Sequence, residues 1–213
     1  MPRYDLILFD MDGTIANTDD VIVESFNELY DLYRGGKRTP LEQIYYFSGP
    51  PLRETLPKEF PDMDYDFIYQ EFYRISGSKY DTMVKGYPYS KEVKLKLKEE
   101  GIKLGVVTNK AHNLAVHCLE IIHLDDVMDV LIGVGDVKNN KPDPEGILKA
   151  MEIVGIKDKK KVLYVGDNYI DYLSAKNAGV DSCLVTWGPR EVSKEAKPTY
   201  KISDYRELLE VIK

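Results

Sequence analysis

The strongest constraint on the fold is a repeated alternation of short apolar runs with helical patterns. The runs read as buried strands because they are brief, apolar and bounded by turn residues. They cover residues 4–9, 102–108, 127–133, 162–166 and 181–186. Helical patterns between them cover residues 91–100, 111–122, 144–154 and 169–178, and most end at a glycine. This order predicts an α/β fold whose parallel sheet carries helices on both faces and binds ligands beyond the carboxyl ends of its strands.

One interval, residues 15–84, breaks this rhythm. It offers helical patterns over residues 20–33, 40–47 and 65–76 but no convincing strand. We therefore expect a Rossmann-like core formed by residues 1–15 and 84–213, with residues 16–83 inserted as an α-helical cap domain. The many tyrosines of the insert, at helical spacing, are expected mainly to pack.

Composition restricts the function classes. Lys and Arg total 29 against 36 Asp and Glu, a formal net charge of −7, which argues against nucleic acid as a partner. No apolar run approaches the roughly 20 residues that span a bilayer, and the first residues lack the apolar segment of a secretory signal. We expect a cytoplasmic protein that does not bind membranes, and the sequence leaves its oligomeric state open.

Two carboxylates follow the first strand. Asp10 and Asp12 are two residues apart, so in an extended chain they project to the same side. Gly13 permits a tight exit and Thr14 offers a hydroxyl to order the loop. Taken alone, this motif is equally typical of an ordinary turn with capping side chains.

Three further polar motifs follow later strands. Thr108 and Asn109 precede a helix, where free backbone N–H groups can receive an anion, although such a pair is also a common cap. Lys141 precedes the next helix and by itself resembles a solvated surface charge. Asp167 and Asp171 are four residues apart across a helix start and can share one face.

These motifs acquire meaning together, because the carboxyl ends of parallel strands lie at one edge of the sheet. Carboxylates gathered in a cleft raise one another's pKa unless a cation intervenes, and an oxygen-rich site of this kind suits Mg²⁺. A bound dication would let Asp10 and Asp167 stay ionised and would attract a phosphate into a negative cleft. The sequence thus predicts a magnesium cofactor and a small phosphorylated metabolite as substrate.

In this order the motifs resemble those of the haloacid dehalogenase superfamily. The resemblance covers residues 6–186 and rests on Asp-Met-Asp-Gly-Thr at 10–14, Thr-Asn at 108–109, Lys-Pro-Asp-Pro at 141–144 and Gly-Asp with a second Asp at 166–171. The helical insert is similar to the family's cap. Residues 47–52, Phe-Ser-Gly-Pro-Pro-Leu, resemble a segment of phosphoglycolate phosphatase-like and pyrophosphatase-like members.

The resemblance implies catalytic roles for individual residues. Asp10 would attack phosphorus and become an aspartyl-phosphate, while Asp12 would protonate the leaving oxygen and later deprotonate water. Thr108 and the backbone of Asn109 would bind the phosphate. Lys141 would pair with Asp10 and with the developing negative charge.

It also implies a metal site. Asp10, the carbonyl of Asp12 and Asp167 would bind Mg²⁺, and Asn168 and Asp171 would orient that shell. Asn168 departs from the serine that many members carry there. A second departure is the run Tyr-Pro-Tyr-Ser at 87–90, where relatives commonly show Pro-Gly.

Other activities remain to be weighed. Asp12 argues against the superfamily's dehalogenases and phosphonate hydrolases, which lack an acid at that position. Sugar phosphomutases keep both aspartates but typically add a histidine soon after the first motif, whereas the three histidines here lie in the core. Outside the superfamily, phospho-receiver domains have a different order of motifs, and a non-catalytic phospho-binding regulatory module remains the second alternative.

Specificity is expected to reside in the cap, whose closure would exclude water and contact the leaving group. Arg53 is our candidate for such a substrate contact, and a solvated surface arginine is the competing interpretation. Phosphoglycolate-like compounds, nucleotides, sugar phosphates and pyrophosphate all remain candidate substrates.

Overall fold

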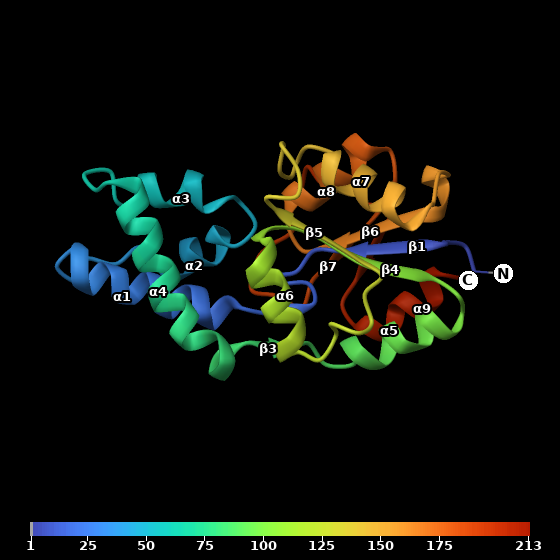
Figure 1. The fold of residues 1–213 in the computed structure, drawn as a ribbon, viewed down its shortest axis with the longest axis horizontal. Coiled ribbons are helices and arrows are strands. Elements are labelled where there is room, and N and C mark those ends of the chain that lie inside the picture. Colours follow the sequence, from blue (N-terminus) through green and yellow to red (C-terminus); the bar gives the residue numbers. More distant parts are fainter. Residues whose placement is uncertain (1) are drawn as a thin grey trace.

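The core is a six-stranded sheet with helices on both faces, as Figure 1 shows in a computed structural model that describes residues 2–213. Its strand order is β5-β4-β1-β6-β7-β8, and every neighbouring pair is parallel. The strands are β1 (Leu6–Phe9), β4 (Lys103–Ala111), β5 (Val130–Val134), β6 (Val162–Gly166), β7 (Asp181–Val185) and β8 (Tyr200–Ile202). This confirms the α/β, Rossmann-like prediction.

Alternating side chains of the strands enter two separate apolar layers. Ile7 and Phe9 belong to one layer and Leu6 and Leu8 to the other, and all four are fully buried. Strands covered on both faces read as continuous apolar runs, which is why the sequence pattern identified them. The first layer includes helices α5 (Ser90–Glu99), α6 (His112–Ile121) and α9 (Leu208–Val211), and the second includes α7 (Glu145–Val154) and α8 (Tyr169–Ala178).

A helical cap extends from one end of the core (Figure 1) and has an apolar cluster of its own. Phe26 lies at its centre, with ring centroids 4.8 Å from Phe47 and 5.4 Å from Phe72. The cap helices are α1 (Asp19–Tyr33), α2 (Leu41–Ile44), the short 3-10 helix η1 (Tyr45–Phe47), α3 (Leu52–Glu59) and α4 (Tyr65–Met83). Tyr30 packs in this cluster, as its helical spacing predicted, whereas Tyr46 is exposed.

Two short strands join the cap to the core. β2 (Ala16–Asn17) pairs in antiparallel fashion with β3 (Lys85–Gly86), so the outgoing and returning chain lie side by side. No sequence pattern indicated this ribbon, because two residues are too few to show a period.

Some boundaries differ from prediction. The third predicted strand, 127–133, begins only at Val130, and β8 was not predicted because it is three residues long and lies at the sheet edge. The helix expected around Arg53, after residues 49–51, is observed as α3, and Pro57 lies inside it. The single helix expected over 40–47 is instead α2 followed by η1.

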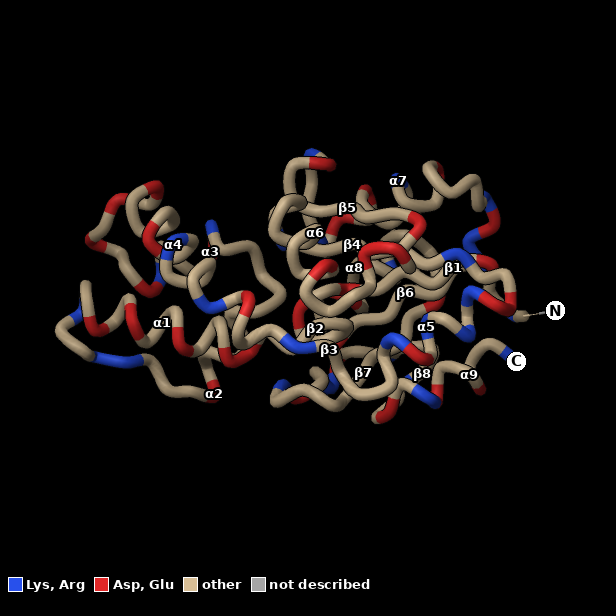
Figure 2. Tube along the Cα trace, turned by 60° about the horizontal axis from the view of Figure 1, so that its bottom comes forward, with Lys and Arg blue, Asp and Glu red and all other residues tan. Residues whose placement is uncertain are grey.

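Charged residues of both signs are spread over core and cap. In Figure 2 Lys and Arg positions lie interspersed with Asp and Glu positions on both parts of the molecule. Within residues 2–213, no helix has the length and apolar character needed to cross a bilayer.

Candidate active site

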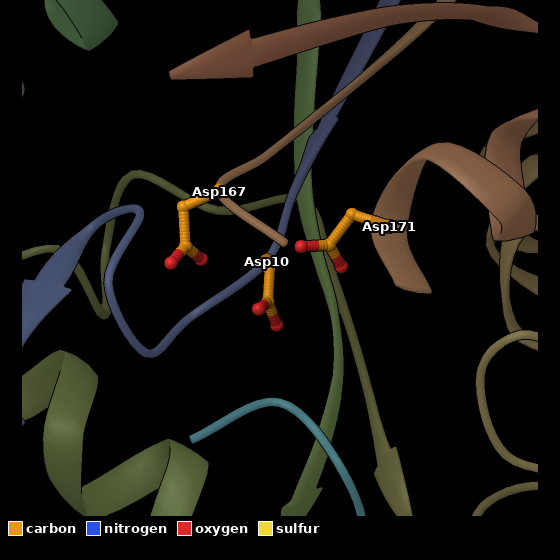
Figure 3. Close-up of side chains that lie close together, drawn as sticks. All are labelled: Asp10, Asp167 and Asp171. Carbon is orange, nitrogen blue, oxygen red and sulfur yellow. The ribbon is translucent and has the colours of Figure 1, made fainter. Parts of the chain in front are cut away.

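Three buried carboxylates converge at the carboxyl ends of β1 and β6 (Figure 3). Asp10, Asp167 and Asp171 each offer an oxygen, and these oxygens lie within 4.8 Å of one another. Gly166 allows this approach, because a Cβ there would lie 2.4 Å from the side chain of Asp171. Residues from distant parts of the chain thus form one acidic centre.

Burial makes this centre costly without a cation. Burial raises the pKa of Asp10 to about 6, with Lys141 opposing and Asp171 reinforcing the shift. It likewise raises the pKa of Asp167 to about 6 against the opposing charge of Arg190. A dication among these carboxylates would remove that penalty.

Lys141 is the cation that the structure does provide. Its Nζ lies 2.7 Å from Asp10 Oδ1 and 2.7 Å from Asp171 Oδ1, and its side chain is buried. Burial opposes its charge, but the two carboxylates more than offset this and hold the Lys141 pKa well above its usual value. Asn109 fixes the backbone beneath it, because Asn109 Oδ1 accepts from Lys141 N at 2.9 Å and Asn109 Nδ2 donates to Lys141 O at 3.2 Å.

Asp12 lies apart from the three carboxylates, although it is only two residues from Asp10. Both of its oxygens accept hydrogen bonds from Lys110 Nζ at 2.8 Å, and Oδ1 also accepts from Thr18 at 2.7 Å. Burial alone would raise the Asp12 pKa, but Lys110 and Thr18 lower it below its usual value. Asp12 is therefore held as a carboxylate.

Arg190 is the second buried cation of the site. Its Nε donates to Asp167 Oδ2 at 2.6 Å, while Thr14 Oγ1 donates to the other oxygen of Asp167 at 3.2 Å. Nη1 donates to Asp19 Oδ1 at 2.6 Å. Arg190 thus joins a carboxylate of the acidic centre to the first cap helix.

Asn168 occupies the N-cap of α8. Its side chain accepts from Ile170 N at 3.3 Å, and its backbone N donates to Asp171 Oδ2 at 3.0 Å, forming a capping box. Nδ2 donates to the carbonyl of Ser48 in the cap at 3.3 Å. Asn168 therefore orients Asp171 through its backbone while its side chain faces the cap.

A cavity of about 150 Å³ lies between the acidic centre and the cap. Asp10, Asp12 and Thr108 line its core side, and Arg53 lines its cap side. Arg53 is exposed and takes part in none of the ion pairs formed within residues 2–213. The remaining cap lining is largely aromatic and includes Tyr65, Tyr69, Phe72, Tyr73 and Tyr80.

Three charged residues of the site were missed by the sequence reasoning, namely Lys110, Arg190 and Asp19. Lys110 directly follows the predicted pair Thr108 and Asn109, so its position was a usable signal. Arg190 comes five residues after the end of β7, and extending the strand-end argument to this strand would have drawn attention to it. Nothing in the sequence distinguishes Asp19 from its neighbour Asp20.

The donor set of the acidic centre fits a divalent cation. Asp10 Oδ1 is buried and accepts no hydrogen bond, although Lys141 lies at ion-pair distance. Several carboxylate oxygens around one point are the ligands that Mg²⁺ prefers. Asp10, Asp167 and Asp171 are the residues that could hold it.

The fold and site together define an α/β protein with a metal-capable acidic centre beneath a helical cap. Residues 7–185 match the family model described as haloacid dehalogenase-like hydrolase. A protein of Caldanaerobacter subterraneus is 39% identical over 209 residues, covering 97% of this chain and 94% of its own length. Pyrophosphatase PpaX of Halalkalibacterium halodurans is 33% identical, covering 97% and 95%. A Bacteroides fragilis structure described as a haloacid dehalogenase-like hydrolase has a TM-score of 0.87 at 28% identity, covering 96% and 99%.

The chain therefore belongs to the haloacid dehalogenase-like hydrolase family. It is an enzyme of the phosphatase type within that family. The match of residues 7–185 includes each of the four motifs singled out from the sequence.

Proposed function

We propose that this enzyme is a Mg²⁺-dependent phosphatase that hydrolyses a small phosphorylated metabolite through an aspartyl-phosphate on Asp10. The observation that carries the proposal is the position of Asp10, which shares a buried centre with Asp167 and Asp171 and borders the same cavity as Thr108. Residues 1–15 and 84–213 act as the catalytic core, and residues 16–83 act as the cap.

The first half of the cycle forms the phospho-enzyme. A carboxylate oxygen of Asp10 attacks phosphorus, and the bond from phosphorus to the leaving oxygen breaks. Thr108 and the backbone of Asn109 hold the phosphate, and Lys141 stabilises the negative charge that develops. Asp12, which the structure holds as a carboxylate, must first take up a proton from solvent, and it then donates that proton to the leaving oxygen. That step requires Lys110, which pairs with Asp12 in the structure, to turn toward a phosphate oxygen.

The second half regenerates the enzyme. Asp12, now ionised, accepts a proton from water, and the resulting hydroxide attacks the phosphorus of the aspartyl-phosphate. The bond to Asp10 breaks and inorganic phosphate leaves. The low pKa that Lys110 confers on Asp12 favours the ionised form that this step requires.

The metal is proposed to be held by Asp10 and Asp167, with the carbonyl of Asp12 as a further ligand and with Asp171 and Asn168 orienting the carboxylates. Mg²⁺ bound there would neutralise charge on the phosphate and on the carboxylates. The buried Asp10 Oδ1, which accepts no hydrogen bond, supports this assignment.

The cavity favours the smaller candidate substrates. Its volume of about 150 Å³ suits a phosphate with a short leaving group, such as a phosphoglycolate-like compound or pyrophosphate, better than a nucleotide. Arg53 is the one basic residue that the described part of the cap contributes to the lining, so it is proposed to bind a second negative charge on the leaving group. The name of the relative from Halalkalibacterium halodurans agrees with a small, doubly charged substrate.

The phosphomutase alternative receives no support from the site. No histidine is found among the described residues that line the cavity. His112 pairs with Asp136, and His117 pairs with Asp81 at 2.8 Å. Formation of an isomerised sugar phosphate without net phosphate release would nevertheless reveal a mutase.

The decisive experiment measures phosphate release from a panel of phosphometabolites and pyrophosphate with Mg²⁺. Asp10→Asn should lower turnover by on the order of 10⁴-fold or more, because the nucleophile is lost while the side chain keeps its size. Asp20→Asn, at an exposed cap position, is the matched control and should retain full turnover. Equal hydrolysis by wild type and Asp10→Asn, or full activity under chelation, would contradict the proposal.

A further inference from the structure

One cap segment is hydrogen-bonded to three separate segments of the core. Residues 45–49, which we call the docking segment, present three backbone carbonyls to core side chains. Tyr45 O accepts from Arg190 Nη1 at 2.9 Å, Ser48 O from Asn168 Nδ2 at 3.3 Å, and Gly49 O from Asn109 Nδ2 at 3.0 Å. Arg190 and Asn168 follow β7 and β6, and Asn109 lies near the carboxyl end of β4, so the contact extends across the sheet edge that carries the site.

Each donor also holds a functional group of the core. Asn109 brackets the backbone of Lys141. Asn168 binds Asp171 through its backbone N. Arg190 binds Asp167. The same three residues therefore contact the cap through their side chains and contact groups of the acidic centre, Asn168 through its backbone.

Arg190 has the most buried of these connections. Its side chain is 2% exposed, and one guanidinium spans Asp167 in the core, Asp19 in α1 and the carbonyl of Tyr45. A rigid planar fork is suited to such multiple contacts. Two carboxylates from core and cap would otherwise face each other buried and unpaired, which is strongly unfavourable.

Gly49 shows that the fit between the docking segment and the core is close. Its φ is +109°, and a Cβ there would lie 2.8 Å from Asn168 Nδ2. A side chain at this position would be strained and would separate the two surfaces. The core side chain that meets Gly49 is the same asparagine that stands where many family members carry serine.

We propose that Arg190, Asn168 and Asn109 form a latch that holds the cap closed over the active site and makes closure and alignment of the acidic centre one event. They act as positioning residues. Opening the cap removes a partner from each of them, and closing it restores the contacts that hold Lys141, Asp171 and Asp167. Because an enzyme that is closed only part of the time binds substrate more weakly, a weakened latch raises KM.

The first test uses Asn168→Ser, which removes the donor to Ser48 O while serine can still cap α8. Hydrogen–deuterium exchange of the purified protein, without substrate, should show the docking segment exchanging about three- to tenfold faster, the effect of one net hydrogen bond. The melting temperature should stay at the wild-type value. KM should rise by a similar factor.

Arg38→Gln provides the matched control, because Arg38 is an exposed cap arginine that pairs only with Asp31. It should leave the exchange of the docking segment and KM unchanged. The exchange measurement does not depend on which substrate the enzyme uses, so it can fail independently of the proposed phosphatase activity.

A second test separates the two arms of Arg190. Asp19→Asn weakens the arm to the cap and leaves the arm to Asp167, and it should accelerate exchange of the docking segment. Combining it with Arg190→Gln should give no more exchange than Arg190→Gln alone, because both changes break one unit. If Arg190→Gln does not fold, Asp19→Asn and Asn168→Ser still decide the question. Wild-type exchange of the docking segment in both of these variants would overturn the latch.

Discussion

The core and the cap differ in their secondary structure and in the side chains that fill them. The core is a parallel sheet buried on both faces, and its charged side chains meet in tight pairs such as Lys141 with Asp10 and Arg190 with Asp167. The cap is a group of helices around a largely aromatic cluster, with Arg53 as its basic contribution to the shared cavity. Under the proposed function, the reaction chemistry of the core and the substrate selection of the cap can be changed separately, except where the docking segment joins the two regions.

Replacing Lys141 should have the largest effect, and this effect should be confined to the chemistry of the core. Lys141→Met keeps the length of the side chain but removes the charge between Asp10 and Asp171, so kcat should fall by on the order of 10²–10³-fold. Lys138→Met, at an exposed position, should have little effect. Steady-state phosphate release measures both, and a loss confined to KM would contradict the assigned role.

A substitution in the apolar cluster of the cap should destabilise the protein. Phe26→Ala removes the ring that packs on Phe47 and Phe72 and should cost about 3–5 kcal/mol of stability. Denaturant unfolding measures the change, and Leu32→Ala, at a residue 53% exposed, should stay within about 0.5 kcal/mol of wild type. If Phe26→Ala unfolds no more readily than Leu32→Ala, the cap has no apolar core of its own.

Metal binding should affect the core in a pH-dependent way. The pKa values of Asp10 and Asp167 are raised by burial from 3.8 to about 6, so their ionisation penalises the metal-free folded state. The penalty grows as pH rises between about 4 and 6 and is complete above that window. Mg²⁺ should therefore raise the melting temperature more at pH 7.5 than at pH 5, where protons compete for the carboxylates.

Differential scanning fluorimetry at both pH values, with and without Mg²⁺, measures this difference. Asp167→Asn is the informative variant, because it removes one ligand and should reduce the Mg²⁺-induced shift at pH 7.5. An equal shift at the two pH values would contradict the role of these carboxylates as metal ligands.

The smallest effect is expected at Arg53. Arg53→Gln should raise KM for a doubly charged substrate about three- to tenfold, with kcat unchanged, because an exposed contact contributes modestly. Lys58→Gln lies on the same helix, outside the cavity lining, and should behave as wild type. An equal rise in KM for a substrate whose leaving group is uncharged would show that Arg53 does not bind the charge of the leaving group.

The fold was largely predictable, and the exceptions have physical causes. The apolar runs of β1 and β6 could be recognised in the sequence, because strands buried on both faces need continuous apolar residues. The ribbon of β2 and β3 did not, because its pairing depends on two segments about 70 residues apart in the chain.

The candidate site divides in the same way. The sequence was enough to predict that one site contains Asp10, Thr108, Lys141 and Asp167, because parallel strands end at one edge and strand order is regular. The environment of Asp12 could not be predicted, because it depends on Lys110, whose Nζ donates to both oxygens of the Asp12 carboxylate. The contact of Asn168 with the cap could not be predicted either, because its side chain donates to Ser48 O, 120 positions away in the sequence.

The sequence by itself determined the α/β architecture, the helical insertion and the identity of the acidic motifs, because periodicity and strand-end position are local properties. Only the tertiary structure decided that Arg190 would join Asp167 to the cap and that the docking segment would contact three separate segments of the core. Those pairings arise when separately formed surfaces meet, and charge and shape at such a junction have no local signature in the chain.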